Sequence, residues 1–108
     1  MSTDNPMQLG MVGLGRMGAN LVRRLMRDGH SCVVFDVNPS AVADLAAEGA
    51  TGADSLADLV SKLDQPRNIW LMLPAGITSQ ILDELAGHLE PGDTVIDGGN
   101  GRWFFTDD

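Results

Sequence analysis

The sequence predicts an α/β protein in which a doubly wound parallel sheet lies between two layers of helices. Two patterns predict this fold class. Short, continuous apolar runs, typical of strands buried on both faces, alternate with segments in which apolar residues recur every three or four positions. Turn residues (Gly, Pro and Asn) separate these segments. The length of 108 residues fits one domain of about 100–150 residues and leaves no room for a second.

The chain begins with a predicted strand and a predicted helix. Residues 7–13 are short and apolar and end in glycine, which is typical of a buried strand. Residues 16–28 follow with helical periodicity, and Gly29 is placed to end that helix. Its apolar face is expected to contain Met17, Leu21, Val22, Leu25 and Met26.

A second strand and helix follow. Residues 31–36 are rich in β-branched residues and predict another buried strand. Asn38 is a suitable N-cap, and proline at the next position favours the first turn of a helix. This helix is expected to end at Gly49, before a very short strand near Ala50 and Thr51.

Three further segments complete the alternation. Ser55 and Asp58 resemble a capping box, so residues 55–63 predict a third helix. Residues 67–73 and 94–97 are apolar runs that predict the fourth and fifth strands. The helix between them is marked by Ile77, Ile81, Leu82, Leu85 and Leu89. Helices on both faces of a parallel sheet give a three-layer αβα architecture.

The composition excludes several classes of function. The net charge is −8 and the pI is about 4.4, which argues against binding to nucleic acid or to an anionic membrane. The single cysteine, Cys32, cannot form an internal disulfide. No apolar run reaches the roughly 18–20 residues that span a bilayer, and residues 1–6 lack the pattern of a signal peptide. We therefore expect a cytoplasmic protein with a loose tail at residues 1–6.

Positive charge is concentrated near the N-terminus. Residues 10–36 hold four arginines and two aspartates, a local net charge of +2 in an acidic chain. An anion is therefore expected to bind in this region. In the alternative interpretation, Arg23, Arg24 and Arg27 lie on the solvated face of the first helix.

A glycine-rich motif follows the first predicted strand directly and opens the first predicted helix. It reads Gly13-Leu14-Gly15-Arg16-Met17-Gly18, a G-x-G-x-x-G. In a Rossmann-type fold the first glycine permits the tight turn, the second lets a pyrophosphate approach the backbone, and the third lets helix and strand pack closely. The helix N-terminus then offers unpaired N–H groups to the phosphates. Arg16 is positioned to add a charged contact, and the alternative is a tight turn without a ligand.

Asp36 ends the second predicted strand, 18 residues after the last glycine of the motif. A carboxylate at this place accepts hydrogen bonds from the hydroxyls of the adenosine ribose and repels a 2′-phosphate. The sequence therefore favours NAD over NADP. Asp36 is also placed to cap the following turn, and the two roles are compatible.

Two more loops are expected at the same end of the sheet. Leu73-Pro74-Ala75-Gly76 follows the fourth predicted strand, and Asp97-Gly98-Gly99-Asn100 follows the fifth. In doubly wound sheets ligands lie at the carboxyl ends of the strands. The amide of Asn100 is suited to a carboxamide or a substrate hydroxyl. The alternative interpretation for both loops is an ordinary turn.

Other chemically active residues carry little signal. His30 and His88 are expected on the surface, and Cys32 is expected in the core. No metal-ligand spacing and no Ser-His-Asp arrangement is visible. We therefore expect no metal site.

The glycine motif and its continuation through Leu21 resemble the β-hydroxyacid dehydrogenase superfamily. Within it, the chain is most similar to the decarboxylating 6-phosphogluconate dehydrogenase family. Asn20 stands where other members of the superfamily usually have proline, and Asp97-Gly98-Gly99-Asn100 is similar to the Asp-Gly-Gly-Asn-Ser of that family. The resemblance covers residues 7–100.

The resemblance implies oxidative decarboxylation of 6-phosphogluconate to ribulose 5-phosphate, in the pentose phosphate pathway. It implies that Gly13–Gly18 hold the pyrophosphate and that Asp36, Val37 and Asn38 meet the ribose. By the same resemblance, Leu73, Pro74 and Ala75 would lie alongside the bound cofactor. Asn100 would contact both its nicotinamide end and the sugar acid. NADP-using members usually carry an arginine after the position of Asp36, and this chain has none there.

The chain departs from the family after Asn100. Gly101 replaces the family serine, and the sequence given ends at Asp108, before the positions of the family's catalytic lysine and glutamate and its helical domain. Lys62 lies too early to replace that lysine. We therefore expect residues 7–108 to be a dinucleotide-binding domain that binds cofactor without turnover. The alternatives are a free-standing nucleotide-binding module and another reductase of the superfamily.

A parallel sheet that lacks its last strand is expected to leave one strand edge exposed. Residues 94–97 would form an exposed edge beside Trp103, Phe104 and Phe105. Because exposed edges and apolar patches favour association, we expect self-association or marginal stability.

Overall fold

The computed structural model of this chain describes residues 7–98 and 102–105. The elements alternate between strand and helix for most of this length. In chain order they are β1 (Gln8–Val12), α1 (Arg16–Arg27), β2 (Ser31–Phe35), α2 (Pro39–Ala47), β3 (Thr51–Gly52), α3 (Leu56–Ser61), β4 (Asn68–Leu71), α4 (Ala75–Ala86), β5 (Thr94–Asp97) and β6 (Arg102–Phe105).

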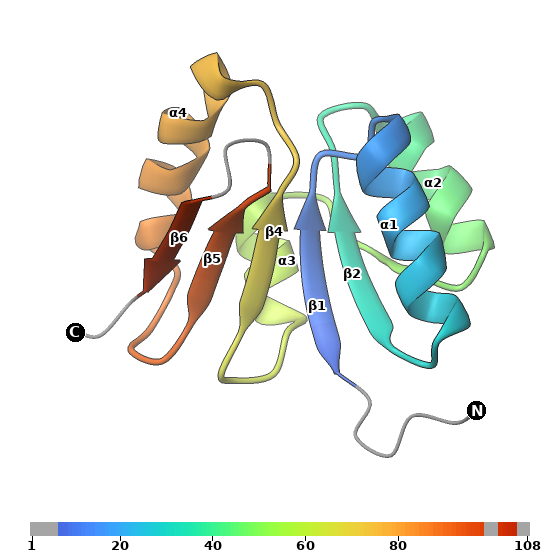
Figure 1. The fold of residues 1–108 in the computed structure, drawn as a ribbon, viewed down its shortest axis with the longest axis horizontal. Coiled ribbons are helices and arrows are strands. Elements are labelled where there is room, and N and C mark those ends of the chain that lie inside the picture. The colour runs from blue at the N-terminus through green and yellow to red at the C-terminus, as the bar shows by residue number, and fades with distance from the viewer. Residues whose placement is uncertain (1–6, 99–101, 106–108) are drawn as a thin grey trace.

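The strands form one sheet in the order β3-β2-β1-β4-β5-β6. Strands β1 to β5 are parallel, as the sequence predicts, and β6 is antiparallel to β5. The chain leaves β1 toward β2 on one side and returns through α3 to β4 on the other, so the direction of winding changes between β1 and β4 (Figure 1). Val12, Phe35, Leu71 and Asp97 mark the carboxyl end of the sheet, where the parallel strands terminate.

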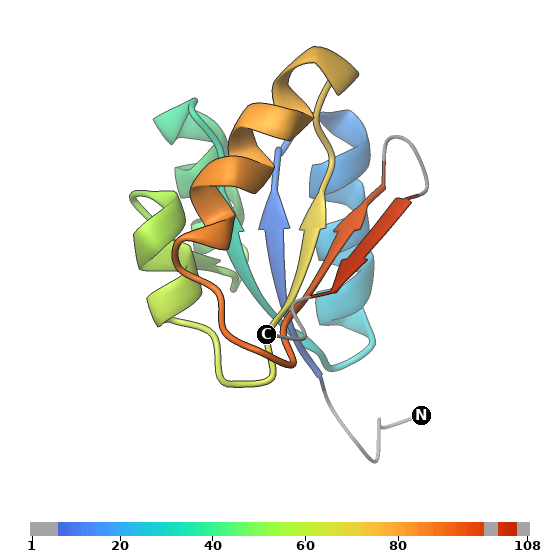
Figure 2. The same ribbon diagram turned by 90° about the vertical axis from the view of Figure 1, so that its left-hand side faces the viewer.

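Two layers of apolar side chains hold the helices to the sheet. One face packs against α3 and α4 through a cluster that includes Leu59, Ile69 and Leu85. The other face packs against α1 and α2 through a cluster that includes Val22 and Leu45. The edge-on view shows α1 on one side of the sheet and α3 and α4 on the other (Figure 2). The predicted three-layer architecture is confirmed.

The predicted helix starts and stops are also confirmed. The side chain of Asn38 accepts a hydrogen bond from the Ser40 amide at 3.0 Å, which caps α2. Ser55 caps α3 by accepting from the Asp58 amide at 3.0 Å. Gly29 follows the end of α1 with a φ of 96°, a conformation that costs glycine little. None of the helices within residues 7–98 is long and apolar enough to cross a membrane.

The expected exposed edge at residues 94–97 is wrong. Arg102–Phe105 forms β6 and pairs with β5 along its whole length, with Phe105 opposite Thr94 and Arg102 opposite Asp97. The backbone donors and acceptors on that side of β5 are therefore satisfied by a sixth strand. Self-association stays a prediction that the fold does not test.

Two residues expected in apolar helix faces are exposed instead. Met17 is 71% exposed and Ile77 is 43% exposed. Both lie in the first turn of a helix, α1 or α4, close to the carboxyl end of the sheet. Periodicity assigns a residue to a face of the helix, but it does not say whether the sheet extends far enough to cover that residue.

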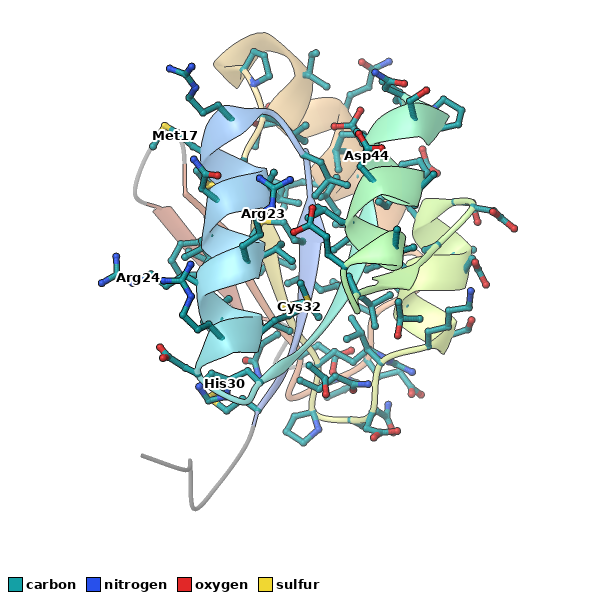
Figure 3. The ribbon with its side chains drawn as sticks, turned by 90° about the vertical axis from the view of Figure 1, so that its right-hand side faces the viewer. Met17, Arg23, Arg24, His30, Cys32 and Asp44 are labelled. Carbon is teal, nitrogen blue, oxygen red and sulfur yellow. The ribbon has the colours of Figure 1, made fainter. Side chains whose placement is uncertain are left out.

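The arginines of α1 do not all lie free in solvent. Arg23 forms a bidentate pair with Glu48 beyond the end of α2, with both N–O distances 2.9 Å (Figure 3). This pair holds the pKa of the Glu48 carboxyl below its usual value. Arg24 and Arg27 are exposed, as expected for a solvated helix face.

A buried ion pair joins the starts of β4 and β5. Asp93 is 1% exposed, and its carboxylate accepts from the Arg67 amide at 2.7 Å, the Arg67 guanidinium at 3.0 Å and the Glu90 amide at 2.9 Å. Burial acts to raise the pKa of Asp93, but these hydrogen bonds outweigh it and the pKa lies below its usual value.

This ion pair makes stability dependent on pH. A carboxyl group with a lowered pKa stabilises the fold above its unfolded pKa of about 3.9, and this contribution is lost as the pH falls through the folded pKa. We expect Asp93→Asn to lower the free energy of unfolding by about 2 kcal/mol at pH 7. The variant should also lose less stability than the parent chain between about pH 4 and pH 2. Urea unfolding across this range measures both effects.

The matched control is Glu48→Gln, which breaks the exposed pair with Arg23. Exposed ion pairs contribute little because solvent screens them, so stability should change far less than in the Asp93 variant. Equal losses in the two variants would contradict the role assigned to the buried pair.

Candidate functional site

The site that the sequence predicts lies at the carboxyl end of the sheet. Three loops begin there, after β1, β2 and β4; β1 and β4 flank the change in winding direction, and β2 lies next to β1. Backbone hydrogen bonds hold the starts of the loops after β1 and β4 against the ends of neighbouring strands. The amide of Gly13 donates to the Phe35 carbonyl at 3.0 Å, and the Met72 amide donates to the Val12 carbonyl at 2.8 Å. Doubly wound sheets bind ligands at this place.

The three glycines of the motif have different structural roles. Gly13 has a φ of 99°, and a Cβ there would lie 2.4 Å from the Met72 carbonyl oxygen. A Cβ on Gly18 would lie 2.1 Å from the Gly13 carbonyl oxygen. A Cβ on Gly15 would meet nothing within 4 Å. The fold therefore requires glycine at the first and third positions, whereas at Gly15 glycine leaves open space beside the backbone.

The first turn of α1 is open to an anion. Gly15 is the N-cap and makes no side-chain capping bond, and no acidic residue lies in the first turn. Helices α2 and α3 instead have their first amides capped by Asn38 and Ser55. Arg16, the first residue of α1, is exposed, and Met17 follows it at the N-terminal end of the helix (Figure 3). The uncapped N–H groups and their partial positive charge suit a phosphate.

Asp36 joins the loops after β1 and β2. Its Oδ2 accepts from the Leu14 amide at 2.6 Å, and its Oδ1 accepts from the Asn38 amide at 2.9 Å. The carboxylate therefore caps the turn after β2, as the alternative interpretation held. Each carboxylate oxygen has a second lone pair, so a ribose hydroxyl can still donate to it. Asp36 is half-buried, and Val37 beside it is 86% exposed.

A cavity of about 470 Å³ lies beside Asp36. It is lined by Phe35, Asp36, Val37, Pro39, Val42, Ala43, Ala53 and Asp54. The part of this lining that comes from α2 and from the residues after β3 was not predicted from the sequence. The available signal was the parallel order of β2 and β3, which brings their carboxyl ends together. Its volume lies in the range of small-ligand sites, and its lining combines six apolar residues with two aspartates.

The loops after β4 and β5 are described only in part. Leu73 is half-buried and Pro74 is exposed at the start of α4, whereas the side chain of Ala75 is not among those described. Asp97 is 1% exposed at the end of β5. The Gly98 amide donates to the Leu71 carbonyl at 2.9 Å, which holds the start of this loop beside β4. Asn100, predicted to touch the nicotinamide end and the substrate, lies outside the described residues.

Exposed apolar side chains gather around the same loops. Of the four large hydrophobic residues that are exposed in the described part of the chain, three lie at the carboxyl end of the sheet: Met17, Val37 and Ile77. Large apolar side chains that remain accessible in one place are a common feature of ligand-binding surfaces.

The remaining candidates do not form a second site. Cys32 is buried, and burial raises the pKa of its thiol. His30 accepts a hydrogen bond from the Met7 amide at 2.9 Å through Nδ1, at the opposite end of the sheet. Within the ranges 7–98 and 102–105, no three His, Cys, Asp or Glu residues are grouped to hold a metal ion.

Comparison with known proteins agrees with this geometry. The model of a family described as the NAD binding domain of 6-phosphogluconate dehydrogenase matches residues 8–104. The NAD(+)-dependent decarboxylating 6-phosphogluconate dehydrogenase of Haloferax volcanii is 50% identical over 98 residues, which are 90% of this chain and 33% of that protein. The chain spans about a third or less of the length of the curated relatives it matches.

Solved structures show the same fold. Arogenate dehydrogenase from Synechocystis superposes with a TM-score of 0.72 at 27% identity, over 83% of this chain and 32% of that one. The 6-phosphogluconate dehydrogenase of Plasmodium falciparum gives a TM-score of 0.78 at 24% identity, over 86% of this chain and 21% of that one. At this identity the second similarity concerns the fold alone.

Proposed function

This chain belongs to the family of NAD-binding domains of 6-phosphogluconate dehydrogenase, and we propose that it is the cofactor-binding part of an oxidoreductase that acts on 6-phosphogluconate. In this proposal residues 7–108 form one dinucleotide-binding domain, preceded by a tail at residues 1–6. The enzyme would act in the cytoplasm, in the pentose phosphate pathway.

The observation that carries the proposal is the open space at Gly15 beside an uncapped helix N-terminus. Among the described residues, no side chain blocks the approach of a pyrophosphate to the backbone there, and none bonds to the first amides of α1. Leu14, Arg16 and Met17 complete this phosphate-binding turn.

The adenosine end of the cofactor would lie beside Asp36. Its carboxylate is fixed by two backbone amides and would accept from the ribose hydroxyls, with Val37 and Asn38 next to it. No arginine follows Asp36 to neutralise a 2′-phosphate. We therefore propose NAD as the cofactor in preference to NADP.

The nicotinamide end would run toward β4 and β5, past Leu73, Pro74 and Ala75, to Asn100. Bound NAD would supply a hydride acceptor for C3 of 6-phosphogluconate, whose oxidation precedes loss of carbon dioxide. Asn100 would hold the substrate, and the proton transfers would fall to residues outside the sequence given. We therefore propose that this chain alone binds cofactor without turnover.

The test is a calorimetric titration of this chain with NAD⁺ and then with NADP⁺. We expect NAD⁺ to bind at one site and NADP⁺ to bind at least tenfold more weakly, a difference of about 1.4 kcal/mol. Absence of NAD⁺ binding would overturn the proposed cofactor role of these 108 residues. Oxidation of 6-phosphogluconate by a contaminant-free sample would overturn the proposed lack of turnover.

The second candidate is a dehydrogenase that takes another substrate. The similarity to arogenate dehydrogenase, at 27% identity, favours this possibility because the same fold serves a different reaction there. A substrate panel, applied to a longer protein that contains this chain, separates the two functions. A free-standing nucleotide-binding module would instead bind NAD⁺ and take part in no oxidation.

A further inference from the structure

The cavity beside β2 contains a second carboxylate that the glycine motif does not include. Of its eight lining residues, six are apolar, two are the aspartates Asp36 and Asp54, and none is a lysine, arginine or histidine. Asp36 is the acidic residue that the motif places at the end of β2. Asp54 comes from the loop between β3 and α3. Asp36 and Asp54 therefore line the cavity from separate segments of the chain.

The backbone around Asp54 is held in place from both sides. The Ala53 amide donates to the Val34 carbonyl at 2.9 Å, which fixes the residue before it against β2. The Asp54 amide donates to Oδ2 of Asp58 at 2.9 Å, and Ser55 caps α3 immediately after it. Asp54 itself is exposed. The backbone of Asp54 is thus hydrogen-bonded in place beside the cavity, and its side chain is exposed to a ligand.

Lys62 is the lysine or arginine closest to Asp54 in the sequence, and its ammonium group bonds to other residues. The ammonium group of Lys62 donates to the Gly52 carbonyl at 2.8 Å and lies 3.1 Å from Oδ2 of Asp58. Lys62 is not among the lining residues of the cavity. The lining therefore presents two negative charges with no positive charge to balance them.

We propose that Asp54 is a second determinant of cofactor choice, which acts with Asp36 to exclude a cofactor that carries an additional phosphate on its adenosine ribose. The proposal rests on the proposed function, because it takes this cavity as the place where the adenosine end enters. A phosphate monoester carries a charge of about −1.5 to −2 at neutral pH. The carboxylates of Asp36 and Asp54 would repel it, whereas an uncharged ribose hydroxyl meets no such penalty.

The experiment compares charge-neutralising variants that differ only in position. Asp54→Asn removes the carboxylate at the cavity. Asp44→Asn removes a carboxylate from α2 (Figure 3). Asp44 is not among the residues that line the cavity. Each variant and the parent chain are titrated calorimetrically with NAD⁺ and NADP⁺ at low and at high salt. The quantity compared is the ratio of the two dissociation constants.

We expect Asp54→Asn to reduce the preference for NAD⁺ about fivefold, through tighter binding of NADP⁺ with little change for NAD⁺. Asp44→Asn should leave the ratio unchanged. The difference between the variants should shrink at high salt, because mobile ions screen charges near the surface. Asp54→Lys should reduce the preference further, since it replaces repulsion by attraction.

Two results would overturn the proposal. One is that the ratio of the dissociation constants for NAD⁺ and NADP⁺ is the same in Asp54→Asn and in Asp44→Asn. The other is an equal gain in affinity for both cofactors, which would indicate a general effect of net charge. Failure of the parent chain to bind NAD⁺ would be a separate outcome, which refutes the proposed function itself and this inference with it.

Discussion

Replacing Gly13 by alanine is expected to destabilise the fold by about 3 kcal/mol, more than any other substitution considered for this protein. Two costs combine. The φ of 99° at Gly13 is unfavourable for a residue with a Cβ, at about 1–3 kcal/mol. The added Cβ would also lie 2.4 Å from the Met72 carbonyl oxygen, a backbone atom whose own residue is hydrogen-bonded to Val12. Thermal unfolding should show a fall in Tm of roughly 15 °C.

The control is Gly76→Ala in the first turn of α4. A Cβ on Gly76 would meet nothing within 4 Å, and no positive φ is present there. Alanine also favours helix over glycine, so the control should be neutral or stabilised by up to about 1 kcal/mol. A Gly13 variant as stable as the control would show that the turn rearranges at no cost.

Replacing Gly15 by valine is expected to weaken NAD⁺ binding at least tenfold while lowering stability by only about 1 kcal/mol, because valine is a poorer N-cap than glycine. The backbone at Gly15 has a φ of −67°, which any residue adopts, and no atom of residues 7–98 or 102–105 lies within 4 Å of a Cβ there. The side chain would instead fill the space in which the pyrophosphate approaches the backbone. Calorimetric titration measures the affinity, and circular dichroism during heating measures the stability.

A series at this position separates a steric effect from loss of the fold. Gly15→Ala adds one carbon and should weaken binding less than Gly15→Val, with the same Tm for both. If valine at this position left NAD⁺ affinity intact, the pyrophosphate would have to bind elsewhere. The Gly13 and Gly15 variants together therefore distinguish the glycine that the fold needs from the glycine that the ligand needs.

Local signals were sufficient for most of the fold. Continuous apolar runs identified β1, β2, β4 and β5, and cap residues such as Asn38 and Ser55 placed the helix starts. These features depend on residues a few positions apart, so they are visible in the sequence. The parallel arrangement followed from the alternation of strands and helices.

Features that depend on distant residues were not predicted. Strand β6 is stabilised by pairing with β5, and the sequence analysis took this region as an apolar patch beside an open edge. The partnership of Arg67 with Asp93 joins residues 26 positions apart. The exposure of Met17 depends on where the sheet ends, which helical periodicity does not encode.

The glycine motif and the residues that follow β2 in the candidate site were predicted from the sequence, whereas the part of the cavity lining that comes from α2 and from the residues after β3 was not. The motif predicted a different role for each of Gly13, Gly15 and Gly18, and the packing around each Cβ position is consistent with those roles. Asp36 was expected to serve a ligand, and the structure adds its bonds to Leu14 and Asn38. Asp54 gave no signal because its place beside the cavity results from the pairing of β2 with β3.

The buried pair of Arg67 and Asp93 lies before β4 and β5, at the end of the sheet opposite the glycine-rich turn. The contribution that we expect this pair to make to stability is therefore separated in space from the residues proposed to choose the cofactor. On this proposal, mutations of Asp54 or Val37 during evolution would change the cofactor preference and leave the Arg67–Asp93 pair intact. On the same proposal, a lineage with this architecture would exchange one nicotinamide cofactor for another with little change in folding stability. The same separation makes the exposed positions around the cavity suitable targets for laboratory redesign of cofactor use.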